Sequence, residues 1–214
     1  MIGIIDYGMG NLFSVSKALE RLGVPYTLSH SPQELEKCQG LILPGVGAFP
    51  DAMKALNKTG MKQYILNKVE EGIPLLGICL GMQLLFDESE ENGTTEGLQL
   101  LPGRVVRFAG KDAAGHAYKI PHMGWNELQH LQPEAKLLSK MDGGYVYFVH
   151  SYYVDTPDKH VVLASAQYET EVPAVVGKGN VYGAQFHPEK SSTTGMKILE
   201  NFCNVVRDQE GVER

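Results

Sequence analysis

Short apolar runs alternate with segments of helical periodicity along the first 86 residues. The apolar runs are typical of buried strands, and they occupy residues 1–6, 25–29, 41–43 and a stretch that begins at residue 75. Between them, apolar residues recur at helical spacing over residues 12–22, 50–58 and 61–71, and Ser31-Pro32 is typical of a helix start. Because strands and helices alternate, the pattern predicts a mostly parallel sheet covered by helices on both faces.

The pattern changes after Phe86. Residues 88–96 are acidic and polar without periodicity, which predicts a surface loop. Short β segments follow, and they are predicted over residues 104–108, 125–130, 145–149, 161–167, 172–176 and 181–186. Apolar residues from Met196 to Val206 predict a final helix. We therefore expect one α/β domain over residues 1–208, with an open, mostly parallel sheet and additional short antiparallel strands in the C-terminal half. Residues 209–214 are expected to form a polar tail.

Composition and charge narrow the class of protein. The chain of 214 residues is 43% hydrophobic and 21% charged, which is ordinary for a soluble globular protein. Its net charge of −6 offers no basis for nucleic-acid binding, and no apolar run approaches a membrane span. The N-terminus lacks the basic region of a signal peptide, and the histidines form no tight ligand cluster, so no metal site is predicted. The three cysteines lie far apart, which argues against a disulfide framework and favours a reducing, cytoplasmic location.

The stretch that begins at Leu75 carries the strongest chemical signal. It runs into Gly77-Ile78-Cys79-Leu80-Gly81, which we interpret as a sharp turn from a strand into a helix that continues to Phe86. This is the nucleophile-elbow pattern G-x-S-x-G with cysteine in place of serine. The turn places the sulfur at the N-terminus of a helix, where the helix dipole favours the nucleophilic thiolate. The alternative is a buried structural cysteine, which is the commonest role of a free cysteine.

A second segment, Gln185-Phe186-His187-Pro188-Glu189-Lys190, favours the nucleophile. A thiol nucleophile needs a base within hydrogen-bond reach, and the base needs a third group that orients its ring. His187 and Glu189 are of these two types, and Pro188 fixes the backbone φ between them. Alone, His187 would be interpreted as a solvated loop residue. Together with Cys79, it predicts a catalytic triad of Cys79, His187 and Glu189.

The segment Gly45-Val46-Gly47 follows a predicted buried strand and is a candidate oxyanion hole. Its glycines allow backbone N–H groups to turn toward a ligand, which is what an oxyanion hole beside a nucleophile requires. We expect the N–H of Leu80 and one from Val46 or Gly47 to stabilise the oxyanion, and Gly45 to lie against the substrate. The alternative is an ordinary glycine turn after a strand. Gln83, on the helix after the nucleophile, is a further substrate-binding candidate.

These motifs resemble the class I (triad) glutamine amidotransferases, whose domains hydrolyse glutamine through a Cys-His-Glu triad and pass ammonia to a synthase. Four further blocks resemble one subfamily, the glutaminase subunit of imidazole glycerol phosphate synthase from histidine biosynthesis. The blocks are Asp6-Tyr7-Gly8-Met9-Gly10-Asn11, Pro44-Gly45-Val46-Gly47-Ala48-Phe49, Pro121-His122-Met123-Gly124-Trp125-Asn126 and Tyr147-Phe148-Val149-His150-Ser151-Tyr152-Tyr153. The resemblance extends from residue 6 to about residue 196 and so covers nearly the whole chain.

The resemblance implies a substrate, a partner and further site residues. L-Glutamine would be the substrate without a cofactor, and ammonia would pass to a cyclase subunit, a (β/α)₈ barrel, that makes imidazole glycerol phosphate and AICAR within a heterodimer. Ser151 and Tyr152 would contact the amino-acid part of glutamine, whereas we expect His150 to be a satisfied buried histidine. Asn11, which is also a candidate helix N-cap, and Trp125 would face the partner. The alternative for Trp125 is a place in the core.

Two alternative functions fit the same residues. The same chemistry could serve another synthase, such as those for GMP, anthranilate or pyridoxal phosphate, but the Asp6–Asn11 and Pro121–Asn126 blocks favour imidazole glycerol phosphate synthase. The chain could also be a non-catalytic binding subunit on the same fold. The presence of Cys79, His187 and Glu189 together argues against that.

Overall fold

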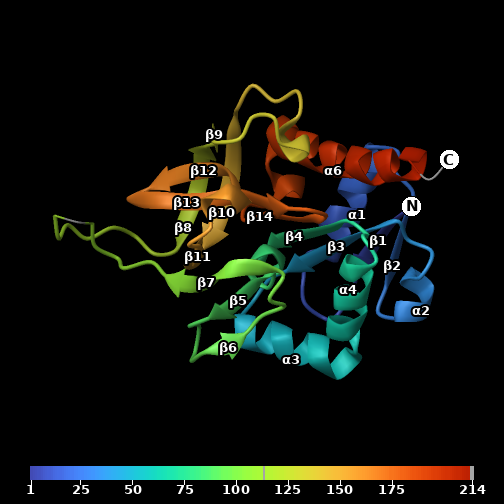
Figure 1. The fold of residues 1–214 in the computed structure, drawn as a ribbon. Helices are drawn as coiled ribbons and strands as arrows, with labels where there is room; N and C mark the ends of the chain where they lie inside the picture. The colour runs from blue at the N-terminus through green and yellow to red at the C-terminus, as the bar shows by residue number, and fades with distance from the viewer. Residues whose placement is uncertain (113, 213–214) are drawn as a thin grey trace.

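The computed structural model describes residues 1–112 and 114–212, and at its centre lies an eight-stranded sheet (Figure 1). The strand order is β2-β1-β3-β4-β14-β13-β12-β9. The bounds of these strands are β1 Ile2–Ile5, β2 Tyr26–Ser29, β3 Gly40–Gly45, β4 Leu75–Cys79, β9 Gln129–His130, β12 Val162–Tyr168, β13 Thr170–Lys178 and β14 Val181–Ala184. Neighbouring strands from β2 to β14 are parallel, whereas β13, β12 and β9 extend the sheet with antiparallel pairing. The predicted fold class is thereby confirmed.

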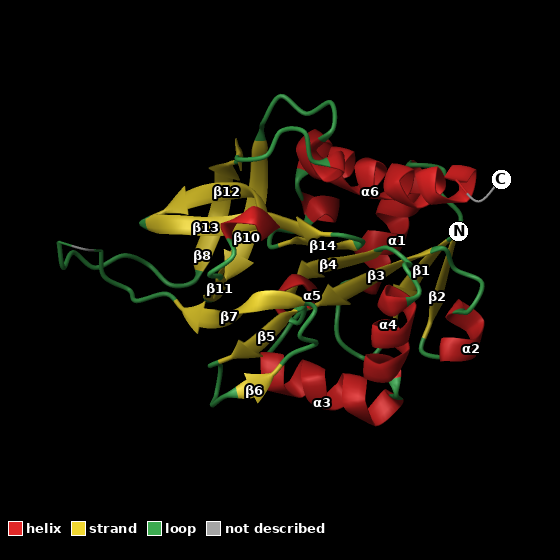
Figure 2. Cartoon of the chain, in the orientation of Figure 1, coloured by secondary structure: helices red, strands yellow, loops and turns green. Residues whose placement is uncertain are grey.

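Helices cover both faces of this sheet (Figure 2). One face packs against α1 (Leu12–Arg21) and α6 (Ser192–Val212), and the other against α3 (Phe49–Thr59) and α4 (Met61–Glu70). Successive side chains of a strand point to opposite faces. Accordingly Leu41 and Leu43 of β3 belong to the core beneath α3 and α4, while Ile42 belongs to the core beneath α1 and α6. The continuous apolar runs of the sequence are explained by this burial on both sides.

Two smaller sheets and several short helices complete the fold. One sheet pairs β10 (Tyr145–His150) with β8 (His122–Glu127), and the other has the order β11-β7-β5-β6. The remaining elements are β5 Phe86–Ser89, β6 Thr95–Glu96, β7 Leu101–Arg107, β11 Tyr152–Asp155, α2 Pro32–Leu35, α5 Leu80–Gln83, η1 Lys136–Leu138, η2 Lys159–Val161 and η3 Pro188–Lys190. Figure 2 shows β5, β7, β8 and β11 beyond the arrowheads of β3 and β4, where a parallel sheet places its ligand sites.

The prediction for residues 84–96 is wrong. The helix after the elbow ends at Gln83 rather than Phe86, and the two ends of the acidic segment belong to β5 and β6, with only residues 90–94 left as the turn between them. Residues 84–86 are fully buried, and their carbonyl groups accept hydrogen bonds from the backbone N–H groups of residues 98–101. Buried backbone groups need hydrogen-bond partners, and for this run residues 98–101 supply them in place of a further helical turn.

The C-terminal end of the last helix and the cap of the first helix also differ from expectation. Helix α6 begins at Ser192 and continues to Val212, so residues 209–212 of the predicted tail are helical, and residues 213–214 lie outside the described residues. Asn11 does precede α1, and its carbonyl accepts from the N–H of Val15, but its side chain makes no capping hydrogen bond. Over the described residues, no helix has the length and apolar character needed to cross a membrane.

Candidate active site

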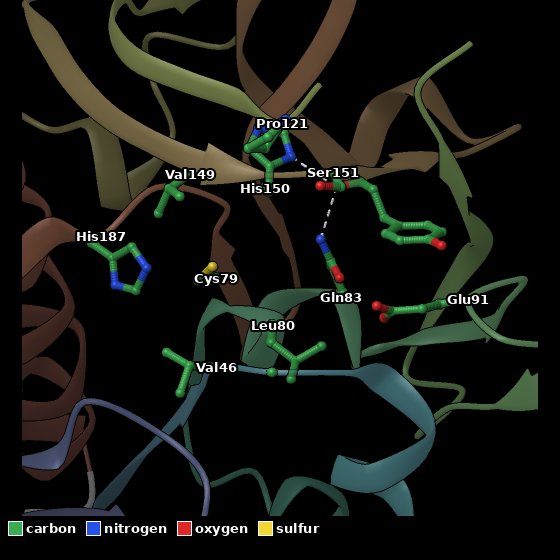
Figure 3. A pocket seen from close by; sticks show the side chains of 12 residues that line it. Val46, Cys79, Leu80, Gln83, Glu91, Pro121, Val149, His150, Ser151 and His187 are labelled. Atoms are coloured by element: carbon green, nitrogen blue, oxygen red, sulfur yellow. Dashed lines mark hydrogen bonds between the residues drawn. The ribbon is translucent and has the colours of Figure 1, made fainter. Parts of the chain in front are cut away.

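A cavity of about 360 Å³ opens where β3 and β4 end (Figure 3). Segments far apart in the sequence contribute its walls, among them the loop after β3, the elbow after β4 and the connection between β10 and β11. The lining residues are Val46, Gly47, Cys79, Leu80, Gln83, Glu91, Pro121, Val149, His150, Ser151, Tyr152 and His187. The predicted nucleophile, its predicted base and most of the predicted substrate residues are therefore brought to one site.

Cys79 stands at a strained turn, as the elbow pattern predicts. It is the last residue of β4 and has φ +56° and ψ −113°, a conformation that side-chain-bearing residues rarely adopt. A Cβ on Gly81 would collide with the carbonyl of Leu43, and one on Gly77 would collide with the carbonyl of Gly81. The glycines are thus required by close backbone packing on both sides of the nucleophile. The sulfur is directed into the cavity (Figure 3).

His187 and Glu189 form a buried hydrogen-bonded pair beside the elbow. The distance from His187 Nδ1 to Glu189 Oε1 is 2.8 Å, and the two side chains are 4% and 0% exposed. The carboxylate can only accept, so Nδ1–H donates and the other ring nitrogen is left for the thiol. The His187 ring lies in the same cavity as Cys79 (Figure 3). The orienting role predicted for Glu189 is consistent with this geometry.

The electrostatic surroundings of His187 favour its charged form. Burial by itself lowers the pKa of this ring, but the Cys79 sulfur and the Glu189 carboxylate both raise it, and together they bring the pKa to about 10. The charged form of His187 is therefore favoured beside the sulfur. A group in that state is a proton donor for a leaving amine.

Sheet pairing explains why these distant residues meet. Strand β14 lies parallel to β4 with Ala184 opposite Ile78, so the residues after each strand emerge side by side. Gln185 follows β14, and its Nε2 lies 4.0 Å from the sulfur of Cys79. Gln83 connects Gln185 with the start of β11, because its Nε2 donates to Gln185 Oε1 at 3.0 Å and to the Tyr152 carbonyl at 2.9 Å.

The predicted oxyanion and substrate residues fall into two groups. Those that line the cavity are Val46, Gly47, Leu80, Gln83, Ser151 and Tyr152. Gly45 is not part of the lining. It pairs with Cys79 at the end of β3, and a Cβ there would lie 2.6 Å from the backbone nitrogen of Gly81. The structure thus gives Gly45 a packing role beneath the elbow.

Two residues of the site escaped the sequence analysis. Glu91 lines the cavity, and its Oε2 accepts a 2.8 Å hydrogen bond from the N–H of Phe49. It comes from the acidic segment that was predicted to be a surface loop, and nothing in the sequence separates it from Glu88 or Glu90. His122 is fully buried, and its Nδ1 lies 2.8 Å from His150 Nε2. A contact between residues so far apart leaves no local sequence signal.

His150 is confirmed as a satisfied buried histidine. It is 7% exposed, and its second ring nitrogen, Nδ1, lies 2.7 Å from the Tyr152 carbonyl. Burial lowers its pKa to about 3. Within the described part of the chain, no three histidine, cysteine, aspartate or glutamate side chains are grouped to hold a metal ion.

The two predicted partner-facing residues are placed differently. Trp125 is 52% exposed on β8, so the alternative of a core tryptophan is excluded. It borders a second cavity of about 540 Å³ together with Glu189, Lys190 and Arg21, directly behind the predicted triad. Asn11 is half-buried at the start of α1. Their predicted contact with a partner stays a prediction.

The chain is similar to known proteins over nearly its whole length. The family model described as "Glutamine amidotransferase class-I" matches residues 3–206. The chain is similar to "Imidazole glycerol phosphate synthase subunit HisH" of Geobacillus sp. (strain WCH70), with 65% identity over 206 residues that cover 96% of this chain and 97% of the relative. It is 60% identical over 210 residues to the protein of the same name from Bacillus subtilis (strain 168), covering 98% of this chain and 99% of the relative.

Solved structures show the same fold at lower sequence identity. The crystal structure of a glutamine amidotransferase superimposes with a TM-score of 0.75 at 23% identity, over 96% of this chain and 98% of that one. A chain of the PurLQS structure from Thermotoga maritima superimposes with a TM-score of 0.68 at 19% identity, over 96% and 98% of the two chains.

Proposed function

The chain belongs to the class I glutamine amidotransferase family, and we propose that it is the glutaminase subunit of an imidazole glycerol phosphate synthase. It hydrolyses L-glutamine to glutamate and ammonia without a cofactor. The observation that carries this proposal is the buried His187–Glu189 pair facing Cys79 across a cavity of amino-acid size. The near full-length similarity to subunits of that name supports the choice of synthase.

The mechanism follows from the charges in the site. His187 takes the proton of the Cys79 thiol, and the sulfur attacks the side-chain amide carbon of glutamine and forms a tetrahedral intermediate. His187 then donates its proton to the departing ammonia, and a thioester remains on Cys79. Water, deprotonated by the now neutral His187, hydrolyses the thioester and releases glutamate. Glu189 holds the ring in place throughout, since it accepts from Nδ1.

The developing oxyanion is bound by backbone donors. The N–H of Leu80 starts α5 directly after the nucleophile, and Val46 and Gly47 line the same cavity next to Leu80 (Figure 3). Backbone donors that converge from two neighbouring segments suit a tetrahedral oxyanion. Gly47 has φ +102°, so the peptide between Val46 and Gly47 adopts a conformation that is open to glycine and strained for other residues.

The amino-acid end of glutamine extends away from Cys79 toward Gln83, Glu91 and the Ser151–Tyr152 segment (Figure 3). Glu91 is the acidic side chain of the lining, and we assign it to the substrate's α-ammonium group. Backbone groups of Ser151 and Tyr152 face the substrate's α-carboxylate. The positions of these groups select an L-amino acid that carries a side-chain amide.

Replacing Glu91 with Gln is expected to raise KM for glutamine about tenfold with little change in kcat. The amide keeps the acceptor for the Phe49 N–H but removes the charge that attracts the ammonium, and binding lost equally in ground and transition states appears in KM. Steady-state assays of glutamate release measure this. Glu96→Gln, an exposed position on β6, is the matched control. Unchanged KM in the Glu91 variant would assign the ammonium to another group.

The ammonia passes to a cyclase subunit, which by resemblance is a (β/α)₈ barrel, in a cytoplasmic heterodimer that makes imidazole glycerol phosphate and AICAR. Several large apolar side chains are exposed, and side chains of this kind are suited to docking a protein partner. They include Phe13 on α1, Val46 in the cavity lining, Met123 and Trp125 on β8, and Tyr145 on β10. A partner docked over Val46 would shield the ammonia released at Cys79 from water.

Replacing Trp125 with Ala is expected to weaken association with the cyclase by about 2 kcal/mol or more, roughly 30-fold in Kd. Because this side chain is 52% exposed, the loss of stability should stay well below the roughly 3–5 kcal/mol of a core tryptophan. Titration calorimetry and thermal unfolding separate the two effects. Leu131→Ala, another exposed apolar residue, is the control. A large drop in Tm with unchanged Kd would contradict the assignment.

The proposed function is tested by coexpressing the chain with the cyclase of its own host. The purified complex should release glutamate from glutamine and form imidazole glycerol phosphate with glutamine as the nitrogen source. A complex that forms but hydrolyses no glutamine would refute the proposal.

A further inference from the structure

A chain of hydrogen bonds, buried at two histidines and exposed at its Asn126 end, runs behind the cavity wall. His150 Nδ1 lies 2.7 Å from the Tyr152 carbonyl, and Figure 3 draws this bond beside the one that Gln83 makes to the same wall. His150 Nε2 lies 2.8 Å from His122 Nδ1, and His122 Nε2 lies 2.8 Å from Asn126 Oδ1. The amide nitrogen of Asn126 then donates to the backbone carbonyl of residue 167 at 2.9 Å. The chain thus begins and ends on backbone carbonyl groups.

The two carbonyl ends fix the number of protons in between. Carbonyl groups only accept, so His150 must carry a proton on Nδ1. The amide nitrogen of Asn126 donates to the carbonyl of residue 167, so only its oxygen faces the His122 ring. His122 must therefore carry a proton on Nε2. A third proton is required between the two rings, since two bare lone pairs at 2.8 Å would repel each other. Two neutral imidazoles hold only two protons, so the arrangement suits a pair with one extra proton and a single positive charge.

Turning the Asn126 amide over does not remove this requirement. Its nitrogen would then face His122 Nε2, but its oxygen would face the carbonyl of residue 167 at hydrogen-bond distance. The repulsion between the two imidazole rings would then be replaced by a repulsion between the Asn126 oxygen and this carbonyl. A neutral pair, which burial favours in the free chain, therefore leaves one of these contacts unfavourable in either orientation, and an added proton relieves it.

The cavity lining has no obvious cationic partner for the α-carboxylate of the proposed substrate, because the His187 ring is engaged at the thiol. Glutamine brings an α-ammonium and an α-carboxylate, and Glu91 is available for the ammonium. Among the described residues that line the cavity there is neither lysine nor arginine. His150 belongs to the lining, and His122 lies directly behind it. A proton shared by these two rings would place a positive charge at the wall where a carboxylate can reach it.

We propose that His122 and His150 share one extra proton while glutamine is bound, and that this buried positive charge faces the substrate's α-carboxylate. Asn126 and His122 are positioning residues in this arrangement, because they act on the substrate through His150. The inference rests on the proposed glutaminase function, and it adds a specificity determinant to that site.

The surroundings make the extra proton depend on the ligand. Burial is the main cause that lowers the pKa of His150 to about 3, and the neighbouring His122 and His187 contribute to this lowering, while burial also lowers the pKa of His122. Tyr168 stacks on His122 with ring centroids 4.0 Å apart, and burial raises the pKa of this tyrosine and of Tyr153, so both are neutral. The opposing charge is therefore that of His187. A bound carboxylate offsets these effects, so glutamine binding takes up a proton from solvent.

Calorimetry of glutamine binding tests the proton directly. A Cys79→Ser chain, which does not turn over, is titrated with L-glutamine at neutral pH in buffers of different ionisation enthalpy. The observed enthalpy should vary with the buffer and report uptake of about one proton per glutamine. The Cys79→Ser/His187→Asn chain should show the same uptake, and His116→Gln, at an exposed histidine, should not change it. Buffer-independent enthalpies, or uptake that vanishes with His187, would overturn the proposal.

Two substitutions of Asn126 test the positioning role with Cys79 intact. Leucine has a similar shape but no acceptor, so His122 can hold its one proton on Nδ1, toward His150, and the pair can stay neutral. Aspartate keeps the acceptor toward His122 and adds a negative charge that favours the extra proton, while its second oxygen takes the exposed position of the amide nitrogen. The readout is the ratio of kcat/KM for L-glutamine to that for its α-amide, which lacks the carboxylate. Wild type and Asn126→Asp should favour L-glutamine tenfold or more, and Asn126→Leu should lose most of this preference. Undiminished preference in Asn126→Leu would overturn the proposal.

The experiments separate this inference from the function on which it rests. If the wild-type complex hydrolyses neither glutamine nor its amide, the proposed function fails. If it hydrolyses glutamine but binding takes up no proton, only the shared proton fails. Should Asn126→Leu not fold, calorimetry on the Cys79→Ser chain still decides the question.

Discussion

Replacing Cys79 with Ala should abolish glutamine hydrolysis and leave ammonia-dependent synthesis by the complex intact. Loss of a covalent nucleophile typically lowers kcat by roughly 10⁴- to 10⁶-fold, because the remaining groups bind the substrate but cannot form the intermediate. The fold should tolerate the change, since Cys79 occupies a strained elbow in which alanine relieves no clash and creates none. The elbow is held by the packing of Gly77 and Gly81.

The measurement is synthesis of imidazole glycerol phosphate by the complex with glutamine and, separately, with ammonium salts. Cys203→Ala is the matched control, because Cys203 is also buried and free but lies in α6 away from the cavity. It should keep glutamine-dependent activity. If the Cys79 variant fails with ammonia as badly as with glutamine, the division of labour between the two subunits is wrong.

The isolated chain should be a poor glutaminase that the cyclase and its acceptor substrate activate about 10²- to 10³-fold. That range corresponds to the gain or loss of one oxyanion donor, about 2.7–4 kcal/mol. The structure indicates which peptide of the Gly45–Gly47 loop could supply or withdraw this donor. Gly45 is fixed against the backbone of Gly81, whereas Gly47 has φ +102° in a loop where Val46 is 43% exposed. The peptide between Val46 and Gly47 is therefore the one that can turn its N–H toward or away from the oxyanion.

Partner binding can drive this change only through a differential affinity for the two loop states, of the same few kcal/mol. Kinetic assays of the free chain, the complex, and the complex with an acceptor analogue test it, and kcat/KM should rise along that series. Gly47→Ala should fix one loop state, because a Cβ there would lie 2.8 Å from the Met9 methyl and is strained at this φ. The variant should therefore show little activation. Equal kcat/KM in all three forms of the wild type would rule out the switch.

The catalytic core could be predicted from sequence because each of its parts is local. The elbow around Cys79 is defined by five consecutive residues, and His187 and Glu189 are separated by one proline. The parallel half of the sheet could be predicted equally well, since strands buried on both faces appear as apolar runs between amphipathic helices. Local sequence patterns of this kind can be recognised without knowing which segments pack against them in the fold.

The residues that sequence reasoning missed depend on contacts between distant segments. Glu91 joins the cavity only because residues 86–89 pair with β7 and carry the following turn back toward α3. The helix predicted through Phe86 failed for the same reason, since partners at residues 98–101 decide the backbone conformation there. His122 was singled out only as part of a motif, and its bond to His150 follows from the pairing of β8 with β10.

The pairing of β14 with β4 also sets the moment at which the enzyme can first act. Gln185, at the end of β14, stands 106 residues after Cys79, and the strand that carries it inserts between β4 and β13. A growing chain on the ribosome therefore exposes the thiol long before its base has been synthesised. Long-range parallel pairing of this kind forms slowly. Nascent and truncated chains thus hold an unpaired nucleophile without glutaminase activity, and ammonia release begins only after the last strand has joined the sheet.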